Sequence, residues 1–288
     1  MTRRRWLTTV AGAAVVATGV DALAIEPNRV VVTRHRVGQA GDGPSARLVQ
    51  LSDLHLRAVG RHEERIAAAV AELRPDLILL TGDAIDRAGD IPLLERFLAL
   101  LEPGTPKLAI LGNWEHWGGV DLPALARAYM RANGRLLRNE SAVVPIAGRE
   151  LLVTGLDDLI GGTPDMHAAL HEVGARPDHL LLAHCPLHRD VLQAQAQAPP
   201  SGRGAPDSID PRLWTPQLML AGHTHGGQIA PFGWAPLRPR GSGRYVRGWY
   251  RDAPTALYVS RGLGTSVVPA RLGAAPEVAS FEWALAAT

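Results

Sequence analysis

The feature that most constrains the fold of this chain is a series of short apolar runs, each of which ends in polar residues. The first three are RLVQLSD, DLILLTGD and KLAILGN, and the segments RHEERIAAAVAEL and IPLLERFLALL, which have helical periodicity, lie between them. Three further runs, LLVTGLDD, HLLLAHCP and LMLAGHTHGGQ, continue the rhythm. Such alternation is typical of strands buried in a sheet and joined by crossover helices. We therefore predict an α/β fold.

The length of the chain is compatible with one large domain. Its 288 residues, of which 46% are hydrophobic, can bury a sizeable core. No linker divides the sequence, and no internal repeat is visible. We predict a single domain over residues 25–288. A Pro/Gly/Ala-rich stretch over residues 193–212 is long for a loop inside a compact domain, and we interpret it as a flap near the functional site.

Residues 1–24 have the order of an export signal. Arginines at positions 3–5 precede a weakly apolar run, and the ALA tripeptide at 22–24 has the pattern of a cleavage site. The arginine pair is similar to a twin-arginine signal, and the run is short for a membrane span. We predict an export signal, cleaved or retained as a weak membrane anchor, and a location in the periplasm or on the outer face of the cytoplasmic membrane. The alternative is an N-terminal helix packed on the body.

The charge pattern gives little indication of a polyanionic partner. The formal net charge is +2, and no basic stripe interleaved with aromatic residues is present, so we see no platform for nucleic acid. Five arginines do cluster in RPRGSGRYVRGWYR, residues 238–251. Contact with an anionic substrate or lipid surface is one interpretation of this cluster, and a solvated hairpin is the other.

The polar residues that end the apolar runs form a set of metal ligands. Because open α/β sheets bind ligands at the carboxyl ends of their strands, these residues are expected to converge. Taken singly, each is better explained as a turn former, a cap or a satisfied histidine. Together they combine carboxylates, an amide oxygen and imidazoles, which suits manganese, iron or zinc, and their number fits two divalent ions. The set is Asp53, His55, Asp83, Asn113, His184, His223 and His225.

With this set of residues, the chain resembles the calcineurin-like metallophosphoesterase superfamily. The motifs GHTHGGQ, GRYVRGWY and LYVSRGLGTS resemble its branch of exported or membrane-associated bacterial phosphodiesterases. The resemblance implies a four-layer α/β/β/α sandwich of two mixed sheets flanked by helices. It also implies a metal-bridging hydroxide as nucleophile. The implied ligands are Asp53, His55 and His225 for one metal and Asn113, His184 and His223 for the other, with Asp83, a catalytic residue, bridging both.

One position departs from the family pattern. The family loop usually reads Gly-Asn-His followed by an acidic residue, but here the stretch is GNWEHW and the histidine is replaced by Trp114. His116 could substitute as proton donor if the loop is extended, because residues two apart then share a side. Alternatively, Trp114 forms an apolar wall that binds substrate, or the leaving group needs no protonation. Glu115 could orient the loop or a neighbouring histidine, or it could be solvated. Asp157 and Asp158 could assist at the margin of the site, but turn formation explains them as well.

The sequence thus predicts a two-metal hydrolase of phosphoesters, cleaving a phosphodiester or pyrophosphate bond in an envelope or extracellular substrate that is lipid- or cell-wall-linked. One alternative is an enzyme similar to the UDP-2,3-diacylglucosamine pyrophosphohydrolases, against which export argues. The other is a catalytically weak module that binds a phosphorylated ligand.

Overall fold

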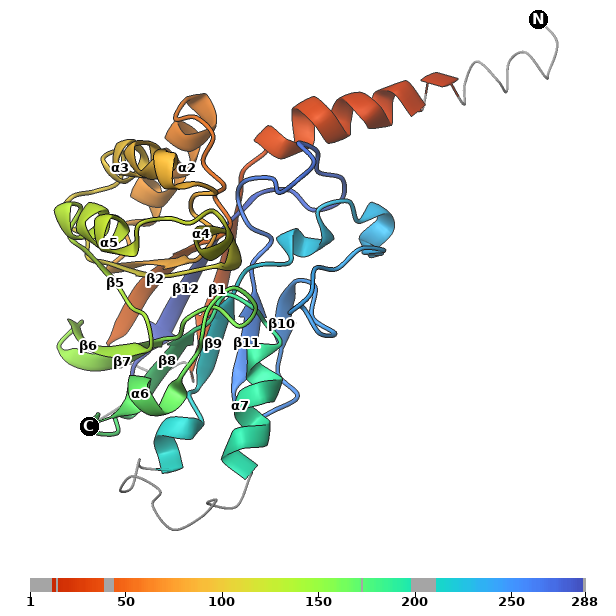
Figure 1. Cartoon of the computed structure of the whole chain (residues 1–288). Helices are drawn as coiled ribbons and strands as arrows, with labels where there is room; N and C mark the ends of the chain where they lie inside the picture. The colour runs from red at the N-terminus through yellow and green to blue at the C-terminus, as the bar shows by residue number, and fades with distance from the viewer. Residues whose placement is uncertain (1–11, 14, 39–43, 172, 198–210, 287–288) are drawn as a thin grey trace, which may run out of the picture.

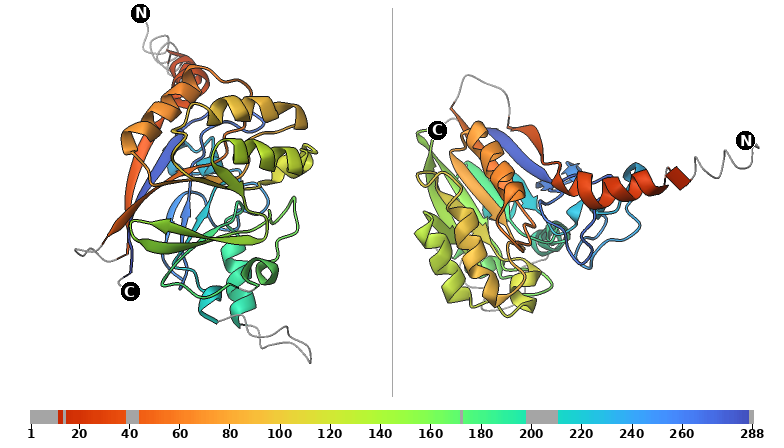
Figure 2. Two further views of the ribbon diagram at one scale, coloured as in Figure 1. Left: turned by 90° about the vertical axis from the view of Figure 1, so that its left-hand side faces the viewer. Right: turned by 90° about the horizontal axis from the view of Figure 1, so that it is seen from above.

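Two six-stranded mixed sheets face each other and carry helices on their outer sides (Figures 1 and 2). The computed structural model describes residues 12–13, 15–38, 44–171, 173–197 and 211–286. Helices α2 (Arg61–Leu73), α3 (Ile91–Leu98) and α5 (Leu122–Arg131) cover the first sheet. Helices α6 (Met166–Leu170) and α7 (His188–Gln197) cover the second. The predicted four-layer α/β fold is confirmed.

The first sheet is built around four parallel strands. Strand β2 pairs with β3, β3 with β4 and β4 with β5 in parallel, while β12 runs antiparallel to β2 and parallel to β1. Strand β12, near the C-terminus, is therefore inserted between β1 and β2 in the sheet that the first half of the chain builds. In spatial order the strands are β1 (Val31–Val37), β12 (Glu277–Ala284), β2 (Ser45–Leu51), β3 (Leu77–Thr81), β4 (Lys107–Ile110) and β5 (Gly134–Leu136).

The second sheet has a parallel centre and antiparallel edges. Strands β11, β9, β8 and β7 are parallel, and β10 and β6 close the two edges as antiparallel partners. In spatial order the strands are β10 (Gly248–Tyr250), β11 (Ala256–Val259), β9 (Leu218–Ala221), β8 (Asp178–Leu182), β7 (Arg149–Gly155) and β6 (Glu140–Ile146).

The continuous apolar runs exist because the central strands are buried on both faces. In β3, Leu77 and Leu79 enter the core between the two sheets, while Ile78 and Leu80 pack against the helices. Successive side chains of a strand point to opposite faces, so a strand between two apolar layers needs apolar residues at every position. The second sheet has a separate outer core under α6 and α7. Three cores therefore separate four layers.

The parallel strands direct all of their carboxyl ends to one edge of the sandwich. Strands β2, β3 and β4 end at residues 51, 81 and 110, and β8 and β9 end at 182 and 221. The predicted polar clusters follow each of these ends directly. Three short helices lie at this edge, namely α4 (Asn113–Trp117), η5 (His225–Gly227) and η6 (Pro231–Gly233). Two others connect other elements, namely η3 (Ala88–Asp90) and η4 (Pro211–Trp214).

A helical segment at the N-terminus, residues 15–28, projects from the body at the end of the sandwich where these loops gather (Figures 1 and 2). It includes η1 (Asp21–Ile25) and η2 (Glu26–Asn28). The buried carboxylate of Glu26 accepts hydrogen bonds from the backbone N–H groups of Gly273 (2.9 Å) and Ala274 (2.6 Å), and the carbonyl of Ala22 accepts one from the backbone N–H of Arg271 (2.8 Å). The segment is therefore attached to the body at its C-terminal end.

Two sequence predictions fall partly outside the described residues. The structure does not describe residues 1–11 of the predicted signal or residues 198–210 of the predicted flap. Within the described ranges, none of the helices combines the length and the apolar character that crossing a membrane requires.

Candidate metal centre

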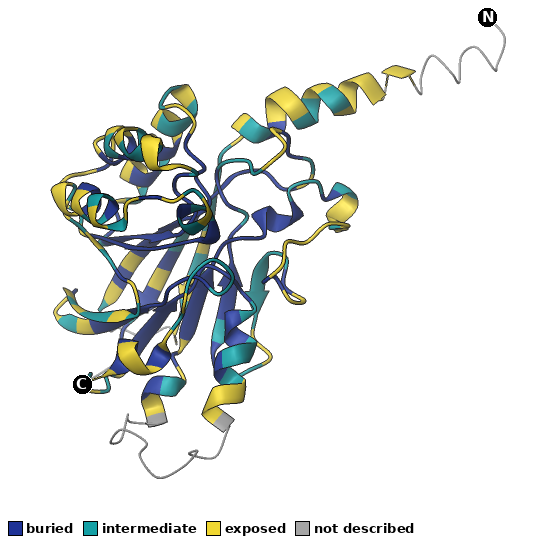
Figure 3. Cartoon of the chain, in the orientation of Figure 1, coloured by how far each residue is buried: buried dark blue, intermediate teal, exposed yellow. Residues whose placement is uncertain are grey.

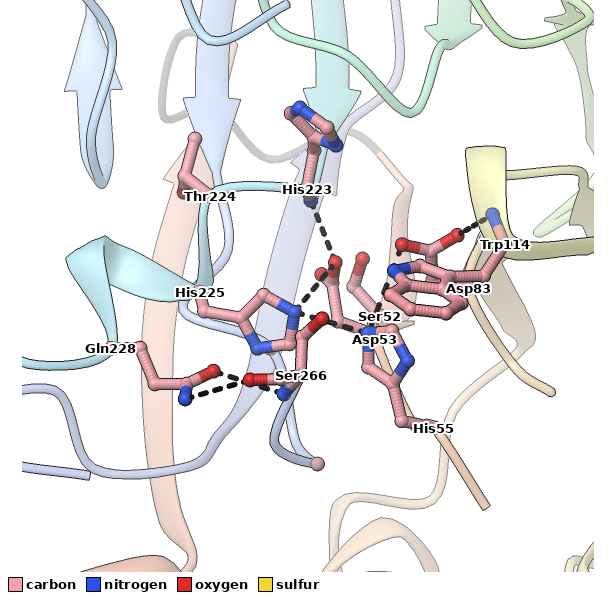
Figure 4. A network of polar contacts seen from close by, with 12 residues as sticks. Ser52, Asp53, His55, Asp83, Trp114, His223, Thr224, His225, Gln228 and Ser266 are labelled. Carbon is pink, nitrogen blue, oxygen red and sulfur yellow. Dashed lines mark hydrogen bonds and ion pairs between the residues drawn. The ribbon is translucent and has the colours of Figure 1, made fainter. Parts of the chain in front are cut away.

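Six of the seven predicted ligands form two adjoining groups at the carboxyl edge of the sandwich. In each group, one potential ligand atom from every residue lies within 4.8 Å of the others, and all six residues are buried. Figure 4 shows that the side chains of Asp53, His55 and His225 lie close to that of Asp83. The first group consists of Asp53, His55 and His225, and the second of Asp83, His184 and His223.

The carboxylate of Asp83 connects the two groups. Its Oδ2 atom lies 3.0 Å from Nε2 of His184 and 3.7 Å from Nε2 of His55. Its Oδ1 atom accepts a hydrogen bond from the backbone N–H of Trp114 at 2.9 Å. Although burial favours the neutral form, His184 and His55 hold the pKa of Asp83 well below its usual range. Asp83 is therefore a charged carboxylate placed between both groups.

The seventh ligand, Asn113, lies beside the second group. It is the first residue of α4, and its Oδ1 atom is 3.0 Å from Nδ1 of His223. Gly112, which precedes it, permits a close approach of the β3 and β4 loops, because a Cβ atom there would lie 2.2 Å from Oδ1 of Asp83.

Three imidazoles are oriented by oxygen atoms outside the ligand set. Nδ1 of His55 lies 2.6 Å from Oδ1 of Asp86, Nδ1 of His184 lies 2.8 Å from the carbonyl of Thr81, and Nε2 of His223 lies 2.7 Å from the carbonyl of Arg240. A ring nitrogen that donates to such an oxygen leaves the other nitrogen deprotonated and free to bind a metal. The sequence analysis missed Asp86, although a carboxylate beside a strand-end cluster is the usual partner of a ligating histidine.

Two buried polar atoms indicate that the centre is suited to cations. Oδ2 of Asp53 has no hydrogen-bond partner among the described residues, and Nε2 of His184 has only its 3.0 Å contact with Oδ2 of Asp83. Buried polar atoms without partners are costly, and both of these are atoms that coordinate divalent metals. The residues present therefore fit a pair of metal ions.

The ligands are brought together by unusual backbone conformations. Asp53 (φ 51°) and His55 (φ 43°) both adopt the left-handed region, as do Asp83 (52°), His223 (73°) and His225 (52°). This region is sparsely populated by residues other than glycine, and such strain is concentrated at functional sites. Asp53 and His55, two residues apart, would point the same way only in an extended chain, but β2 ends at Leu51. Their side chains converge through tight loop turns instead.

Glu115 is a buried anchor of these loops. Its carboxylate accepts hydrogen bonds from the backbone N–H groups of Ala84 (2.6 Å), Gly112 (2.9 Å) and Asp83 (3.1 Å), and a longer one from Ile85 (3.3 Å). Burial and the nearby charge of Asp83 raise the pKa of Glu115 to about 7. Of the two roles considered for Glu115, the structure supports the orientation of the loop.

The loop that contains Trp114 is helical, so the extended geometry assumed for His116 is wrong. Residues 113–117 form α4, in which side chains two apart do not share a side. Nε2 of His116 lies 2.6 Å from Oδ1 of Asp157, a buried residue that also accepts from Nε of Arg138 at 2.9 Å. Helix formation is explained by Glu115, which accepts from the N–H of Gly112 at the start of α4.

Trp114 instead borders a cavity of about 630 Å³ that opens beside the ligands. Its ring contacts His55 edge to face, with centroids 5.9 Å apart, and Trp117 at 5.8 Å. The cavity is lined mainly by apolar side chains, together with two arginines of the predicted cluster, Arg238 and Arg240. These two belong to the loop before β10, whereas Arg244 pairs with Asp252 away from the cavity.

The pair formed by His116 and Asp157 leads to a prediction about pH. Hydrogen bonding to Asp157 raises the pKa of His116. Burial alone would raise the pKa of Asp157, but the pKa is lowered by hydrogen bonds from His116, the N–H of Thr163 and Arg138. The pair therefore stabilises the fold fully above the ordinary carboxyl pKa and below the ordinary imidazole pKa, between about pH 4 and 6.5. Its contribution is lost as the pH rises through the raised pKa of His116. We expect the difference in Tm between wild type and His116→Ala to be largest in that window and to narrow at higher pH. A difference that stays constant from pH 4 to 9 would show that the pair does not titrate in this way.

Comparison with known proteins agrees with this geometry. Residues 46–227 match the family model described as calcineurin-like phosphoesterase. The chain belongs to this family, and it is a metallophosphoesterase, a hydrolase of phosphoric esters.

Similar curated proteins include two bacterial relatives of nearly the same length. An uncharacterized metallophosphoesterase, YkuE of Bacillus subtilis, is 32% identical over 98% of this chain and 97% of its own. The phosphodiesterase YaeI of Escherichia coli is 28% identical over 98% of this chain and 99% of its own. Among solved structures, the 5′-nucleotidase precursor of Thermus thermophilus matches with a TM-score of 0.47 and 16% identity, over 84% of this chain and 54% of that chain.

Proposed function

We propose that the protein is a two-metal phosphodiesterase or pyrophosphatase that belongs to the branch of exported bacterial enzymes with the GHTHGGQ motif. The observation that carries this proposal is the position of Asp83, whose Oδ2 atom lies within 3.7 Å of a histidine from each ligand group. A carboxylate shared by two groups is the arrangement expected of a binuclear site.

The residues around the centre would hold two divalent ions and position the phosphoester. Asp53, His55 and His225 would bind one ion, Asn113, His184 and His223 the other, and Asp83 both. Manganese, iron or zinc would act as Lewis acids and lower the pKa of a water molecule. The carbonyl of Arg240 and the carboxylate of Asp86 fix the imidazole orientations, so these protein groups need little rearrangement during turnover.

The cavity beside the ligands supports a substrate with an apolar portion. Trp114 and Trp117 form one aromatic wall, while Arg238 and Arg240 supply positive charge near the phosphoester. This combination favours a lipid- or cell-wall-linked phosphoester over a small polar one. It also gives Trp114 the role of a substrate-binding residue.

Location outside the cytoplasm remains part of the proposal. The arginines at positions 3–5 and the apolar run that follows support an export signal. This location is the reason to prefer an envelope or extracellular substrate over the nucleotide-linked lipid of the UDP-2,3-diacylglucosamine pyrophosphohydrolases. A module that binds phosphorylated ligands without cleaving them is the remaining alternative.

The role of proton donor is proposed for His116 because of its protonation state alone, since α4 directs the side chain to Asp157 and the extended loop first considered does not exist. Asp157 raises the pKa of His116, which favours the protonated form that a general acid requires. We expect His116→Ala to lower kcat by about 10²-fold or more for diesters with poor leaving groups, but to leave bis-p-nitrophenyl phosphate little affected. An unchanged kcat with both types of substrate would remove His116 from the mechanism.

The experiment that tests the proposed function is hydrolysis of bis-p-nitrophenyl phosphate, with p-nitrophenyl phosphate alongside, in added Mn²⁺. Turnover of the diester by the wild type that disappears in Asp83→Asn would establish a metal-dependent phosphodiesterase. Absence of turnover in a protein that binds two metals per chain would favour the module that binds without cleaving.

A further inference from the structure

Exposed apolar side chains gather on two loops beside the mouth of the cavity. Phe232 is fully exposed, and Val267, Leu237, Trp234 and Val268 are 79%, 79%, 70% and 50% exposed. Leu237 and both valines also line the cavity. We call these five residues the apolar rim. Exposed apolar groups that form a contiguous patch around a site commonly mark an interaction surface.

The two loops of the rim are held in place by hydrogen bonds. Gln228 donates through Nε2 to the carbonyls of Ser266 (3.0 Å) and Val268 (2.8 Å), and the N–H of Ala230 donates to the carbonyl of Leu272 (2.7 Å). Figure 4 shows the contact between Gln228 and Ser266 beside the metal ligands. These hydrogen bonds therefore fix the two loops of the apolar rim beside the metal ligands.

Two rim residues have a backbone conformation that works against stability. Phe232 has a φ of 54° and Val267 a φ of 61°. For bulky or β-branched residues this region is strained. Their exposed side chains gain little from packing in return. A strained backbone that presents apolar side chains to the outside is better explained by function than by folding.

The loops around the rim are positively charged. Residues 227–251 contain five arginines and no aspartate or glutamate, and one of the five, Arg244, pairs with Asp252. Arg238 and Arg240 lie at the cavity itself. An anionic surface would therefore complement the charge of the loops, while aromatic residues such as Trp234 favour the boundary between lipid and water.

The N-terminal helical segment continues this surface. It is attached to the loop after β11 through Glu26 and Ala22, on the same side of the molecule (Figures 1 and 3). It exposes further apolar side chains, namely Val15, Val16, Val20, Leu23 and Ile25. The segment is thus attached at Arg271, three residues after Val268, and its exposed side chains add to the apolar surface of the rim.

We propose that the apolar rim docks on the surface of an anionic phospholipid bilayer, so that the cavity opens against the membrane. Phe232, Trp234 and Val267 enter the interfacial region, and the arginines contact anionic headgroups. The substrate is then the phosphoester headgroup of an amphiphile, whose apolar part lies along Trp114 and Trp117. This choice of substrate class rests on the proposed function, whereas the docking itself does not.

Sedimentation of the full chain with vesicles tests the docking. We expect binding to vesicles of phosphatidylglycerol and phosphatidylcholine, and weaker binding to phosphatidylcholine alone. The combined variant Phe232→Asn, Trp234→Gln, Val267→Asn should weaken binding by about tenfold or more, because apolar area is removed. Asparagine tolerates a positive φ, so the changes at Phe232 and Val267 relieve backbone strain. An unchanged Tm would show that the fold persists.

A matched control uses exposed apolar residues on the other side of the molecule. The variant Leu100→Gln, Met130→Gln, Val143→Thr changes side chains that are 40%, 66% and 41% exposed. It should bind vesicles as the wild type does. Trp234→Phe should also diminish the blue shift of tryptophan emission that vesicles produce.

Two results would overturn the docking: a wild type that does not bind, or a rim variant that binds as tightly as the wild type. The latter would assign membrane binding to the N-terminal segment alone. Binding without hydrolysis of bis-p-nitrophenyl phosphate would count against the proposed function and leave the docking intact.

Discussion

Asp83→Asn is expected to lower kcat/KM for bis-p-nitrophenyl phosphate by about 10³-fold or more. The carboxylate lies between both ligand groups, 3.0 Å from His184 and 3.7 Å from His55. Replacing it with a neutral amide removes the negative charge that would hold two cations close together. Loss of metal-based charge stabilisation is worth several kcal/mol, which corresponds to this factor in rate.

The metal content of the same variant separates catalysis from folding. We expect elemental analysis to find two metal ions per wild-type chain and at most one per Asp83→Asn chain. The matched control is Asp121→Asn, which makes the same chemical change at the exposed N-cap of α5, where asparagine caps as well as aspartate. It should retain both metals and full activity. Two tightly bound metals and normal turnover in Asp83→Asn would contradict the bridging role.

Glu115→Ala is expected to lower both Tm and activity. Glu115 accepts hydrogen bonds from four backbone N–H groups in the loops after β3 and β4. Each buried donor left without a partner costs about 1–3 kcal/mol, and partial entry of water reduces the sum. We expect a loss of roughly 4 kcal/mol, or about 10 °C in Tm. Displacement of Asp83 and Asn113 by about 1 Å would lower kcat by about 10²-fold.

Two variants make this prediction specific. Glu115→Gln keeps one acceptor oxygen and should lower Tm and kcat less than alanine does. Glu72→Ala removes an exposed glutamate of α2 and should change neither. If Glu115→Ala had the same Tm and kcat as the wild type, the loops would not depend on this carboxylate.

The helices, strands and ligand positions could be predicted because they depend on local patterns. The run DLILLT became β3 and RHEERIAAAVAEL became α2, each with bounds close to those expected. The parallel arrangement then placed the polar residues after β2, β3, β4, β8 and β9 at one edge, which follows from strand direction alone.

The local path of the loops could not be predicted in this way. The spacing of Asp53 and His55 would place them on one side of an extended chain, yet both adopt positive φ values. Residues 113–117 were considered as an extended loop, but they form a helix that directs His116 to Asp157. Asp86 and the carbonyl of Arg240 orient ligands from positions that no motif identifies.

The sequence by itself determined the fold class and the residues that gather in the candidate metal centre, because burial on both sheet faces and the chemistry of metal ligation restrict which residue types can occur. Only the tertiary structure decided which oxygen atoms orient each imidazole, where Trp114 and His116 point, and that the apolar rim borders the cavity. These features depend on contacts between residues far apart in the sequence, such as that of His116 with Asp157, 41 residues further on, and no local pattern encodes a contact that forms only when the whole sandwich has assembled.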